Sequence, residues 1–335
     1  MISMPVPSLP IRDAGIFMSR YKNWERIKNT GASGDWVRNP SWLTLPTVLS
    51  TDQKFVGLHA VWPDANFLSL SAAGAYTVDW GDGVTENVAT GVQAYHEYDF
   101  ADADLANTNA PVTFQDTGDT VTRANHGYTD GMTISFASIT ATTGIDVGQV
   151  YYVINATTNT FQLSATLGGS ALPLTNDGTG IILSFKQAIV TVTPQAGQNL
   201  TALNLNLKHN RAGLQTGYCS GWLDMRVSSP NFSASELTIS GFNVRHAILE
   251  RATILNIGNC TNMTSMFYNC YSLVSVPLFN TAAVTNMVNM FYNCSSLVSV
   301  PLFNTAAVTN MVNMFYNCYS LVSVPLFNTA AVTNM

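Results

Sequence analysis

Two patterns of apolar and polar positions divide the chain. Over most of its first two-thirds, apolar residues alternate with polar ones in short runs. The clearest runs are residues 76–80, YTVDW, and residues 186–194, KQAIVTVTP. A period of two predicts strands with one buried face. Asp-Gly and Gly-Gly pairs separate further runs of this kind, and such pairs are turn signals. The pattern therefore predicts a mainly β protein.

A different pattern fills the C-terminal end. Residues 267–290 and 291–314 are identical except that Tyr271 is replaced by Ser295, and a third copy begins at Phe315. Successive copies define a 24-residue period, and a diverged copy precedes the identical ones. One such unit cannot bury its apolar face alone, so neighbouring units must stack on one another. We expect a solenoid of 24-residue repeats over residues 243–335.

A single copy can be interpreted residue by residue. Phe291, Cys294 and Leu297 are three residues apart, a spacing that predicts a short helical turn with one buried face. Residues 298–300, VSV, predict a short strand that ends at Pro301. Asparagines recur in register, so we expect ladders of side-chain amides between coils.

The frame M-F-x-x-C-x-x-L-x-x-V-P-x-F-x-T-x-x-V-T-x-M begins at Met266, and again at Met290 and Met314. This frame resembles the BspA-like leucine-rich repeats of bacterial surface proteins, mycoplasma lipoproteins and phage proteins. The resemblance covers roughly residues 240–335. It implies an adhesive or structural role and no catalysis.

A second resemblance lies in residues 76–100. A V-x-W-G-D-G stretch from Val78 to Gly83 is followed by H-x-Y from His96 to Tyr98. These marks resemble the PKD-type immunoglobulin-like β-sandwich. That family closes with a strand soon after H-x-Y, whereas here the next matching strand is 186–194. We therefore expect residues 107–184 to be a small β-domain inserted into a sandwich formed by 46–106 and 185–206. Residues 207–242 would then connect the sandwich to the repeats.

The expected insert carries its own signature. It contains A-N-H-G-x-x-x-G-M-x-I-x-F from Ala124, Y-Y-V-I-N-A-T-x-N-T-F-x-L-S from Tyr151, and Gly178-Thr179-Gly180. These elements are similar to a small β-module of phage tail and fibre proteins, and they predict a small β-barrel or sandwich. The similarity implies a virion protein.

Composition narrows the classes of function. Only 10% of residues are charged and the net charge is −6, which disfavours nucleic acid as a partner because phosphate contacts need clustered Lys and Arg. No charged residue follows Arg251. No apolar run reaches the roughly 18 residues of a membrane span. The five cysteines and the lack of a signal-peptide pattern predict reduced thiols in a protein made in a cytoplasm.

The sequence offers little chemistry. It contains no G-x-S-x-G, H-E-x-x-H, P-loop or C-x-x-C motif, and no histidine has a second ligand at metal-binding spacing. Asp79, Asp82 and Glu86 could hold calcium, but we favour Asp82 as the organiser of a turn. Cys270, Cys294 and Cys318 could suggest metal or redox chemistry, but we favour a buried core row. We expect no enzyme activity, no cofactor and no metal.

Two sets of residues are candidates for binding. Tyrosines of the repeats could form an exposed row for a receptor, or could pack at a coil corner. The receptor-contact candidates are Tyr268, Tyr271, Tyr292, Tyr316 and Tyr319. Residues 1–45 hold tryptophans beside basic residues, so this arm could dock on another virion protein or pack back on the sandwich. The virion-anchor candidates are Trp24, Trp36, Trp42, Arg20, Lys22, Arg26 and Lys28.

Together these patterns predict a non-enzymatic phage virion protein. It would be a tail or capsid fibre that anchors by its N-terminal arm and presents the solenoid to a host-surface glycan or protein. We expect a homo-oligomer and, beyond Met335 or in a partner subunit, something that covers the last coil. A purely architectural decoration or neck protein, or a bacterial surface adhesin, stays open as an alternative.

Overall fold

The structure is a computed structural model. It describes residues 36, 38, 42–62, 66–100, 102, 104–107, 110–126, 128, 130–131, 133–149, 151–183, 185–214, 217–233 and 237–335. Within these ranges every regular element is a β-strand, and none is a helix. The prediction of a mainly β protein is confirmed.

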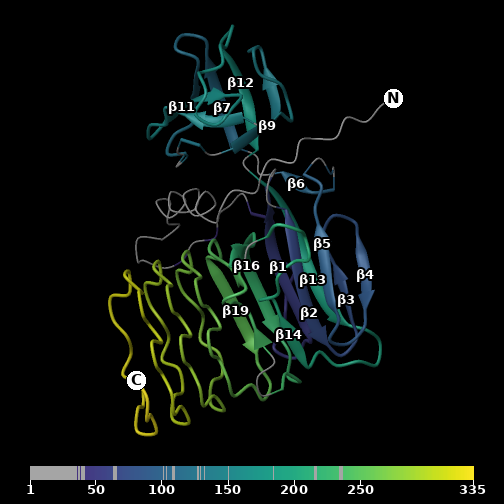
Figure 1. Cartoon of the computed structure of the whole chain (residues 1–335), viewed down its shortest axis with the longest axis vertical. Helices are drawn as coiled ribbons and strands as arrows, with labels where there is room; N and C mark the ends of the chain where they lie inside the picture. Colours follow the sequence, from purple (N-terminus) through teal and green to yellow (C-terminus); the bar gives the residue numbers. More distant parts are fainter. Residues whose placement is uncertain are drawn as a thin grey trace.

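Two sheets face each other in the central body (Figure 1). The larger sheet has the order β19-β16-β1-β13-β3-β4, with β6 paired to β13. Its strands are β1 (Lys54–Val61), β3 (Tyr76–Asp79), β4 (Thr85–Val88), β6 (Ala106–Asn107), β13 (Lys186–Pro194), β16 (Trp222–Ser228) and β19 (Arg251–Asn256). The smaller sheet has the order β17-β14-β2-β5. Its strands are β2 (Phe67–Ala73), β5 (Gln93–Glu97), β14 (Ala202–Asn204) and β17 (Leu237–Thr238).

The strand β13 holds the larger sheet together. It pairs antiparallel with β1 on one side and with β3 on the other, and Val192 lies opposite both Phe55 and Val78. Alternate residues of β13, including Val190 and Val192, are fully buried between the two sheets. The alternating run 186–194 is therefore a strand of the same sheet as 76–79, although a long segment separates them in sequence.

The intervening residues form a closed barrel of six strands, in the order β10-β11-β8-β7-β12-β9. The strands are β7 (Ala110–Gln115), β8 (Thr120–Thr122), β9 (Thr133–Thr140), β10 (Tyr151–Ile154), β11 (Thr160–Ser164) and β12 (Gly178–Leu183). The barrel has a separate core, in which Phe114, Phe136 and Phe161 are almost completely buried. In Figure 1 it lies at one end of the molecule, away from the stacked coils.

The turn after β3 is built from polar side chains. The Nε2 atom of His96 lies 2.6 Å from Oδ2 of Asp82, while Oδ1 of Asp82 accepts a hydrogen bond from the amide of Val84. The ring of His96 stacks on that of Trp80 at 4.8 Å. Gly81 has φ of +80°, and a Cβ there would lie 2.6 Å from the backbone of Ile189. Asp82 thus organises the turn, which is the role that we favoured from the sequence.

The larger sheet continues towards the repeats. β16 pairs antiparallel with β1 and parallel with β19, and Arg251 of β19 forms a parallel bridge with Ser275 of the first coil. One apolar cluster runs from the sandwich through the coils, from Phe55 to Met314. A further small pair, β15 (Tyr218–Cys219) with β18 (Val244–Arg245), joins the same region. The sheet is therefore continuous across residue 206, where the sequence placed a boundary.

The repeats stack in register, each copy on the next (Figure 1). The same backbone hydrogen bond, 2.9 Å long, recurs between successive copies. It runs from the amide of a methionine to the carbonyl of an asparagine in the next copy, and the pairs are Met263 with Asn286, Met287 with Asn310, and Met311 with Asn334. Parallel bridges join the same asparagines from one copy to the next, starting from Asn262. Stacking at this constant interval lets each coil cover the apolar face of its neighbour.

The local prediction for one copy is partly right. The amide of Cys294 donates to Phe291 and that of Leu297 to Cys294, each at 3.1 Å, so the expected turn is confirmed. The expected strand at 298–300 is wrong, because no regular strand occurs within residues 257–335. Val298 donates a single bond to Val274, and Pro301 has no amide hydrogen with which to continue a ladder.

Candidate functional site

A row of aromatic rings follows one side of the stacked coils. Tyr268, Tyr292 and Tyr316 stack with centroid separations of 4.9 and 4.7 Å and interplanar angles of 15° and 18°. Each follows a core phenylalanine, so the tyrosine points away from the buried side while the preceding ring points into it. Phe242 extends the row, at 4.3 Å from Tyr268. The 24-residue period therefore brings three of the five receptor-contact candidates together.

The sequence did not predict the part played by Phe242. The position one full period before Tyr268 is occupied by Val244, so the repeat gives no signal for Phe242. Phe242 is nevertheless 61% exposed, and Tyr316 at the other end of the row is 50% exposed. The row thus has accessible rings at both ends and half-buried rings between them.

Stacking decides which part of each ring a ligand could reach. The faces of Tyr268 and Tyr292 are covered by their neighbours in the row, so their edges and hydroxyl groups form the accessible surface. Partial burial raises the pKa of Tyr268 above its usual value, so this hydroxyl stays protonated and can donate at neutral pH. The row therefore offers a line of hydroxyl donors and apolar ring edges.

The two other tyrosine candidates lie elsewhere on the coil. Tyr271 is half-buried and packs against the cluster that contains Trp42, and its hydroxyl donates to Oδ1 of Asn269 at 3.2 Å. Tyr319 makes the equivalent bond to Asn317 at 2.8 Å but is 79% exposed. Ser295 occupies this position in the middle copy, so no continuous row forms here.

The anchor candidates that the structure describes pack on the chain itself. Trp42 is 5% exposed and lies among Val56, Leu58 and other residues on the outer side of β1. Trp36 donates from Nε1 to Oε2 of Glu250 at 3.1 Å. This is the second of the two interpretations given above for the arm. Arg20, Lys22, Trp24, Arg26 and Lys28 lie outside the described residues.

A row of exposed leucines was not predicted. Leu278, Leu302 and Leu326 are 64%, 60% and 98% exposed, while the phenylalanine after each lies on the core side. The signal was available, since the period places Leu before Phe in every V-P-L-F segment. Adjacent apolar residues in an extended backbone point to opposite sides, so one of the two had to face outward.

One buried pair has the geometry of a nucleophile and a base. Oγ of Ser220 lies 2.6 Å from Nδ1 of His246. Both side chains are at most 2% exposed, and Nε2 of His246 lies 2.5 Å from the carbonyl oxygen of Ile239. The polar side-chain atoms of the pair are all engaged within the protein, so the pair stabilises the fold.

The described ranges contain no metal-binding cluster. Within them, no three His, Cys, Asp or Glu side chains gather closely enough to hold a metal ion. Asp79, Asp82 and Glu86 are among these residues and form no such group. No helix in the described part of the chain has the length and apolar character needed to cross a membrane.

Comparison with known protein families finds a match for the C-terminal end of the chain. Residues 239–335 match the family DUF285, described as a Mycoplasma protein of unknown function. The matched segment begins just before the first coil and covers the whole stack. No curated protein and no solved structure matches the chain.

Proposed function

We propose that this chain is a non-enzymatic structural protein of a phage particle, and that the aromatic row of its repeats contacts the host surface. The observation that carries the proposal is the row itself, Phe242, Tyr268, Tyr292 and Tyr316. The coil stack fixes the spacing of its three tyrosines. Tyrosine and other aromatic residues are enriched where proteins bind partners, because they combine apolar area with a polar tip.

The finer architecture is part of this proposal. The stacked coils are a leucine-rich-repeat-type solenoid, supported by hydrogen bonds that recur at the same position in each copy. The two facing sheets are a PKD-like sandwich, supported by the contacts of Trp80, Asp82 and His96 at the turn after β3. The six-stranded barrel is the inserted phage tail module, supported by the sequence similarity described above.

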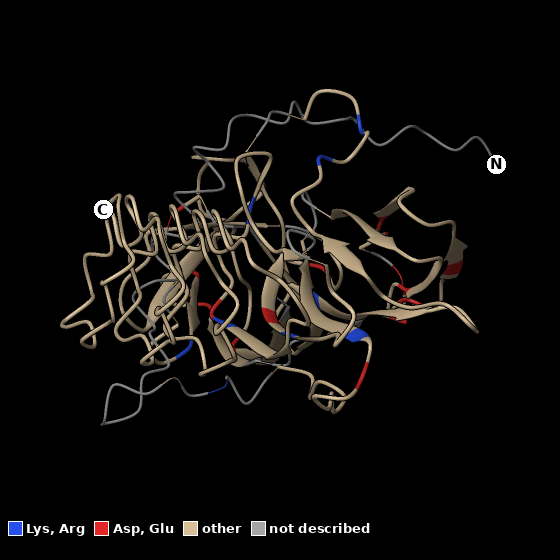
Figure 2. Cartoon of the chain, turned by 90° about the horizontal axis from the view of Figure 1, so that it is seen from below, with Lys and Arg blue, Asp and Glu red and all other residues tan. Residues whose placement is uncertain are grey.

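The charge distribution suggests how such a surface would bind. No charged residue follows Arg251, and the coils at the C-terminal end carry neither blue nor red in Figure 2. Without charges, long-range steering is absent and binding depends on close contact. Hydroxyl donors and ring edges in a line suit an extended polar partner such as a surface polysaccharide. Affinity would then come from several weak contacts along the row.

Competition with adsorption tests this proposal. The purified full chain should slow adsorption of the phage that carries it, and a Tyr268→Ala, Tyr292→Ala, Tyr316→Ala triple variant should compete at least tenfold less well. Tyr95→Ala is the matched control, since Tyr95 is an exposed tyrosine on β5. Equal competition by the triple variant would rule out the row as the receptor surface. Mass spectrometry that finds the chain on a bacterial surface and not in purified particles would rule out the virion role.

A purely architectural role is the second candidate. The exposed leucine row, Leu278, Leu302 and Leu326, favours it, because regularly spaced apolar side chains suit packing between subunits. In that case the chain would be a homo-oligomer that never meets a receptor. The wild-type chain would then fail to compete for adsorption, and a Leu278→Ser, Leu302→Ser double variant would lower the mass of the assembly in light scattering.

A further inference from the structure

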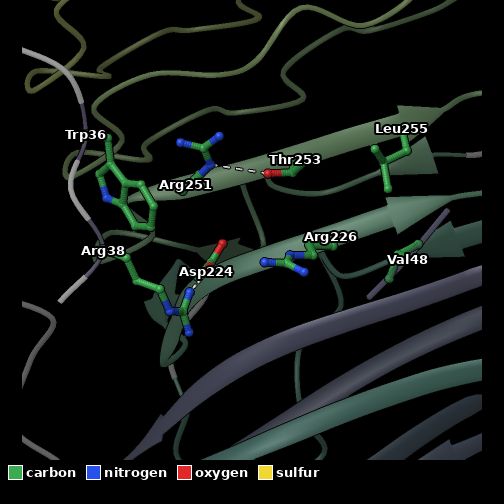
Figure 3. Close-up of a pocket in the computed structure, with 8 residues that line it drawn as sticks. All are labelled: Trp36, Arg38, Val48, Asp224, Arg226, Arg251, Thr253 and Leu255. Atoms are coloured by element: carbon green, nitrogen blue, oxygen red, sulfur yellow. Dashed lines mark hydrogen bonds and ion pairs between the residues drawn. The ribbon is translucent and has the colours of Figure 1, made fainter. Parts of the chain in front are cut away.

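A cavity of about 410 Å³ lies on the outer face of the larger sheet (Figure 3). Its floor is formed by β16 and β19, and the side chains of Trp36 and Arg38 line one side. This volume is within the range of small-molecule sites, roughly 300–1,000 Å³. Nothing in the proposed contact with the host surface requires this cavity.

The strand period explains why the floor is polar. Met225 and Val227 of β16 point into the core, as do Ala252 and Ile254 of β19. The alternate residues must face outward. The two strands are parallel, with Asp224 opposite Arg251 and Arg226 opposite Thr253. Two arginines therefore lie diagonally across adjacent strands, a separation that long side chains can bridge.

The lining is positively charged within an acidic chain. Three arginines against one aspartate leave a formal balance of +2 at the cavity, whereas the whole chain carries −6. Glu250, which accepts the hydrogen bond from Trp36, lowers the local balance to +1. An anionic group is therefore favoured here.

The three arginines differ in the hydrogen bonds that they already make within the protein. Arg38 is engaged by Asp224 and by the carbonyl of Leu43. Arg226 uses Nη1 for the carbonyls of Leu45 and Pro46, at 3.4 and 3.2 Å. Arg251 donates only from Nε, to Oγ1 of Thr253 at 3.3 Å, with its guanidinium 4.8 Å from the centre of the Trp36 ring.

Arg251 is thus held in place by an aromatic ring and a hydroxyl group. Its two terminal nitrogens have no acceptor among the described residues. Such a fixed guanidinium matches the two oxygens of a carboxylate, which it can bind through parallel hydrogen bonds.

Asp224 provides a second, independent requirement for a ligand. Its side chain is almost fully buried, and Oδ1 has no hydrogen-bond partner within the described ranges, although Oδ2 binds Arg38. An unpaired buried acceptor is costly, so native proteins seldom leave one unsatisfied. Burial raises the pKa of the Asp224 carboxyl group. The positive charges of the neighbouring arginines, first of all Arg38, act in the opposite direction and lower it. A donor such as an alcohol hydroxyl would satisfy this oxygen.

We propose that this cavity binds a sugar acid, a small molecule that carries both a carboxylate and hydroxyl groups. The carboxylate binds between Arg226 and Arg251, and a hydroxyl donates to Oδ1 of Asp224. The apolar edge of the sugar ring lies against Trp36. A fully ionised inorganic anion such as sulfate has no hydroxyl donor and would leave Oδ1 of Asp224 unpaired, and a neutral sugar would leave the guanidinium groups without an anion.

Calorimetric titration of the full chain tests the proposal. The probes are D-glucuronate and N-acetylneuraminate, with D-glucose and sulfate as comparisons. At least one sugar acid should bind ten times more tightly than glucose and than sulfate, and its affinity should fall as salt is raised. Equal affinity for glucose, equal affinity for sulfate, or no binding of either sugar acid would each overturn the proposal.

Variants assign the binding to this cavity. Arg251→Gln and Arg226→Gln should each weaken the sugar acid at least tenfold. Arg211→Gln, which removes an arginine paired with Glu97 at a remote site, should leave its affinity unchanged. Unchanged affinity in both cavity variants would refute the site.

A charge-conserving variant covers the case in which a glutamine variant fails to fold. Arg251→Lys keeps the positive charge but cannot bind both carboxylate oxygens in parallel, so it should still weaken the sugar acid several-fold. Wild-type affinity in this variant would also count against the site. The triple tyrosine variant should bind the sugar acid normally, so failure of the adsorption proposal and failure of this one are distinguishable.

Discussion

Nδ2 of Asn293 donates a hydrogen bond to Oδ1 of Asn269, the equivalent residue of the preceding copy, at 2.7 Å. Asn317 donates in the same way to Asn293 at 2.8 Å. All three asparagines have φ between 58° and 60°, in the left-handed region. Asparagine adopts this region more readily than other residues with a side chain. One residue type therefore meets the demands of the turn and links each coil to the next.

We expect Asn293→Ala to destabilise the coils by about 2–3 kcal/mol. Two amide bonds are lost, each worth about 1 kcal/mol, and alanine at positive φ costs roughly 1 kcal/mol more. The measurement is the urea midpoint of unfolding. Asn293→Gly is the matched control, because glycine keeps the backbone conformation and loses only the amide bonds. An alanine variant as stable as the glycine variant would show that the backbone term is absent.

The cysteines of the coils should react slowly in the native protein. Cys270 and Cys294 are fully buried, as predicted, while Cys318 is half-buried. Burial raises the pKa of Cys270 to about 12 and that of Cys318 to about 11. At pH 8 almost no thiolate is present at these positions, and the thiolate is the reactive form. A chromogenic thiol reagent should label Cys318 before Cys270 and Cys294. Fast labelling of all three in the folded chain would contradict this order.

As the pH is lowered, the central body should begin to lose stability at a higher pH than the titration of carboxyl groups explains. Burial lowers the pKa of His59 to about 3 and that of His246 to about 4, from 6.5. The unfolded state binds these protons below pH 6.5 while the folded state does not. Stability is therefore complete above that pH and falls as the pH decreases towards 4, by up to about 1.4 kcal/mol per pH unit for each histidine.

Chemical denaturation between pH 7 and pH 5 measures this effect. The free energy of unfolding should fall across this range, with a slope of about two protons from His59 and His246 near pH 5. Burial also lowers the pKa of His126 and of His209, which adds to the slope. Asp224, whose raised pKa lets it take up a proton in the folded state, opposes the fall as it titrates. A free energy that stays constant from pH 7 to pH 5 would show that neither histidine is held neutral by burial.

Trp42 should be essential for stability. Its side chain is 5% exposed and fills the cluster on the outer side of β1. We expect Trp42→Ala to lower the free energy of unfolding by about 3–5 kcal/mol, the usual cost of removing a buried aromatic side chain. Leu49→Ala is the control, since Leu49 is 57% exposed and should change stability by less than about 0.5 kcal/mol. Equal stability of the two variants would refute the packing of this segment on the sheet.

Most of the correct structural predictions came from sequence patterns in which apolar residues recur at a strict period. The run 186–194 coincides with β13, and the spacing of Phe291, Cys294 and Leu297 correctly predicted the coil turn. Such a pattern depends only on residues that are near one another in the sequence, and it occurs several times along one element or in several copies. Elements without a period, such as Phe242, gave no comparable signal.

The rest depended on contacts between distant segments. The cavity on the larger sheet joins Arg38, Asp224 and Arg251, which are widely separated along the chain. Only the parallel pairing of β16 with β19 brings the last two together. The missing strand at 298–300 was a different error, because high β propensity was outweighed by a proline and by the turns on each side.

The larger sheet ends at β19, which forms a bridge to the first coil, and this has a consequence for how the array forms. If the first coil had to fold without a neighbour, its backbone would be ordered before any contact stabilised it. Folding of that coil would therefore be slow. Here β19 is already held by β16 and offers a prepared edge to Ser275. We therefore expect the array to grow outward from the sandwich, coil by coil. Copies added or lost at the far side would then lengthen or shorten the array without disturbing the place where it begins.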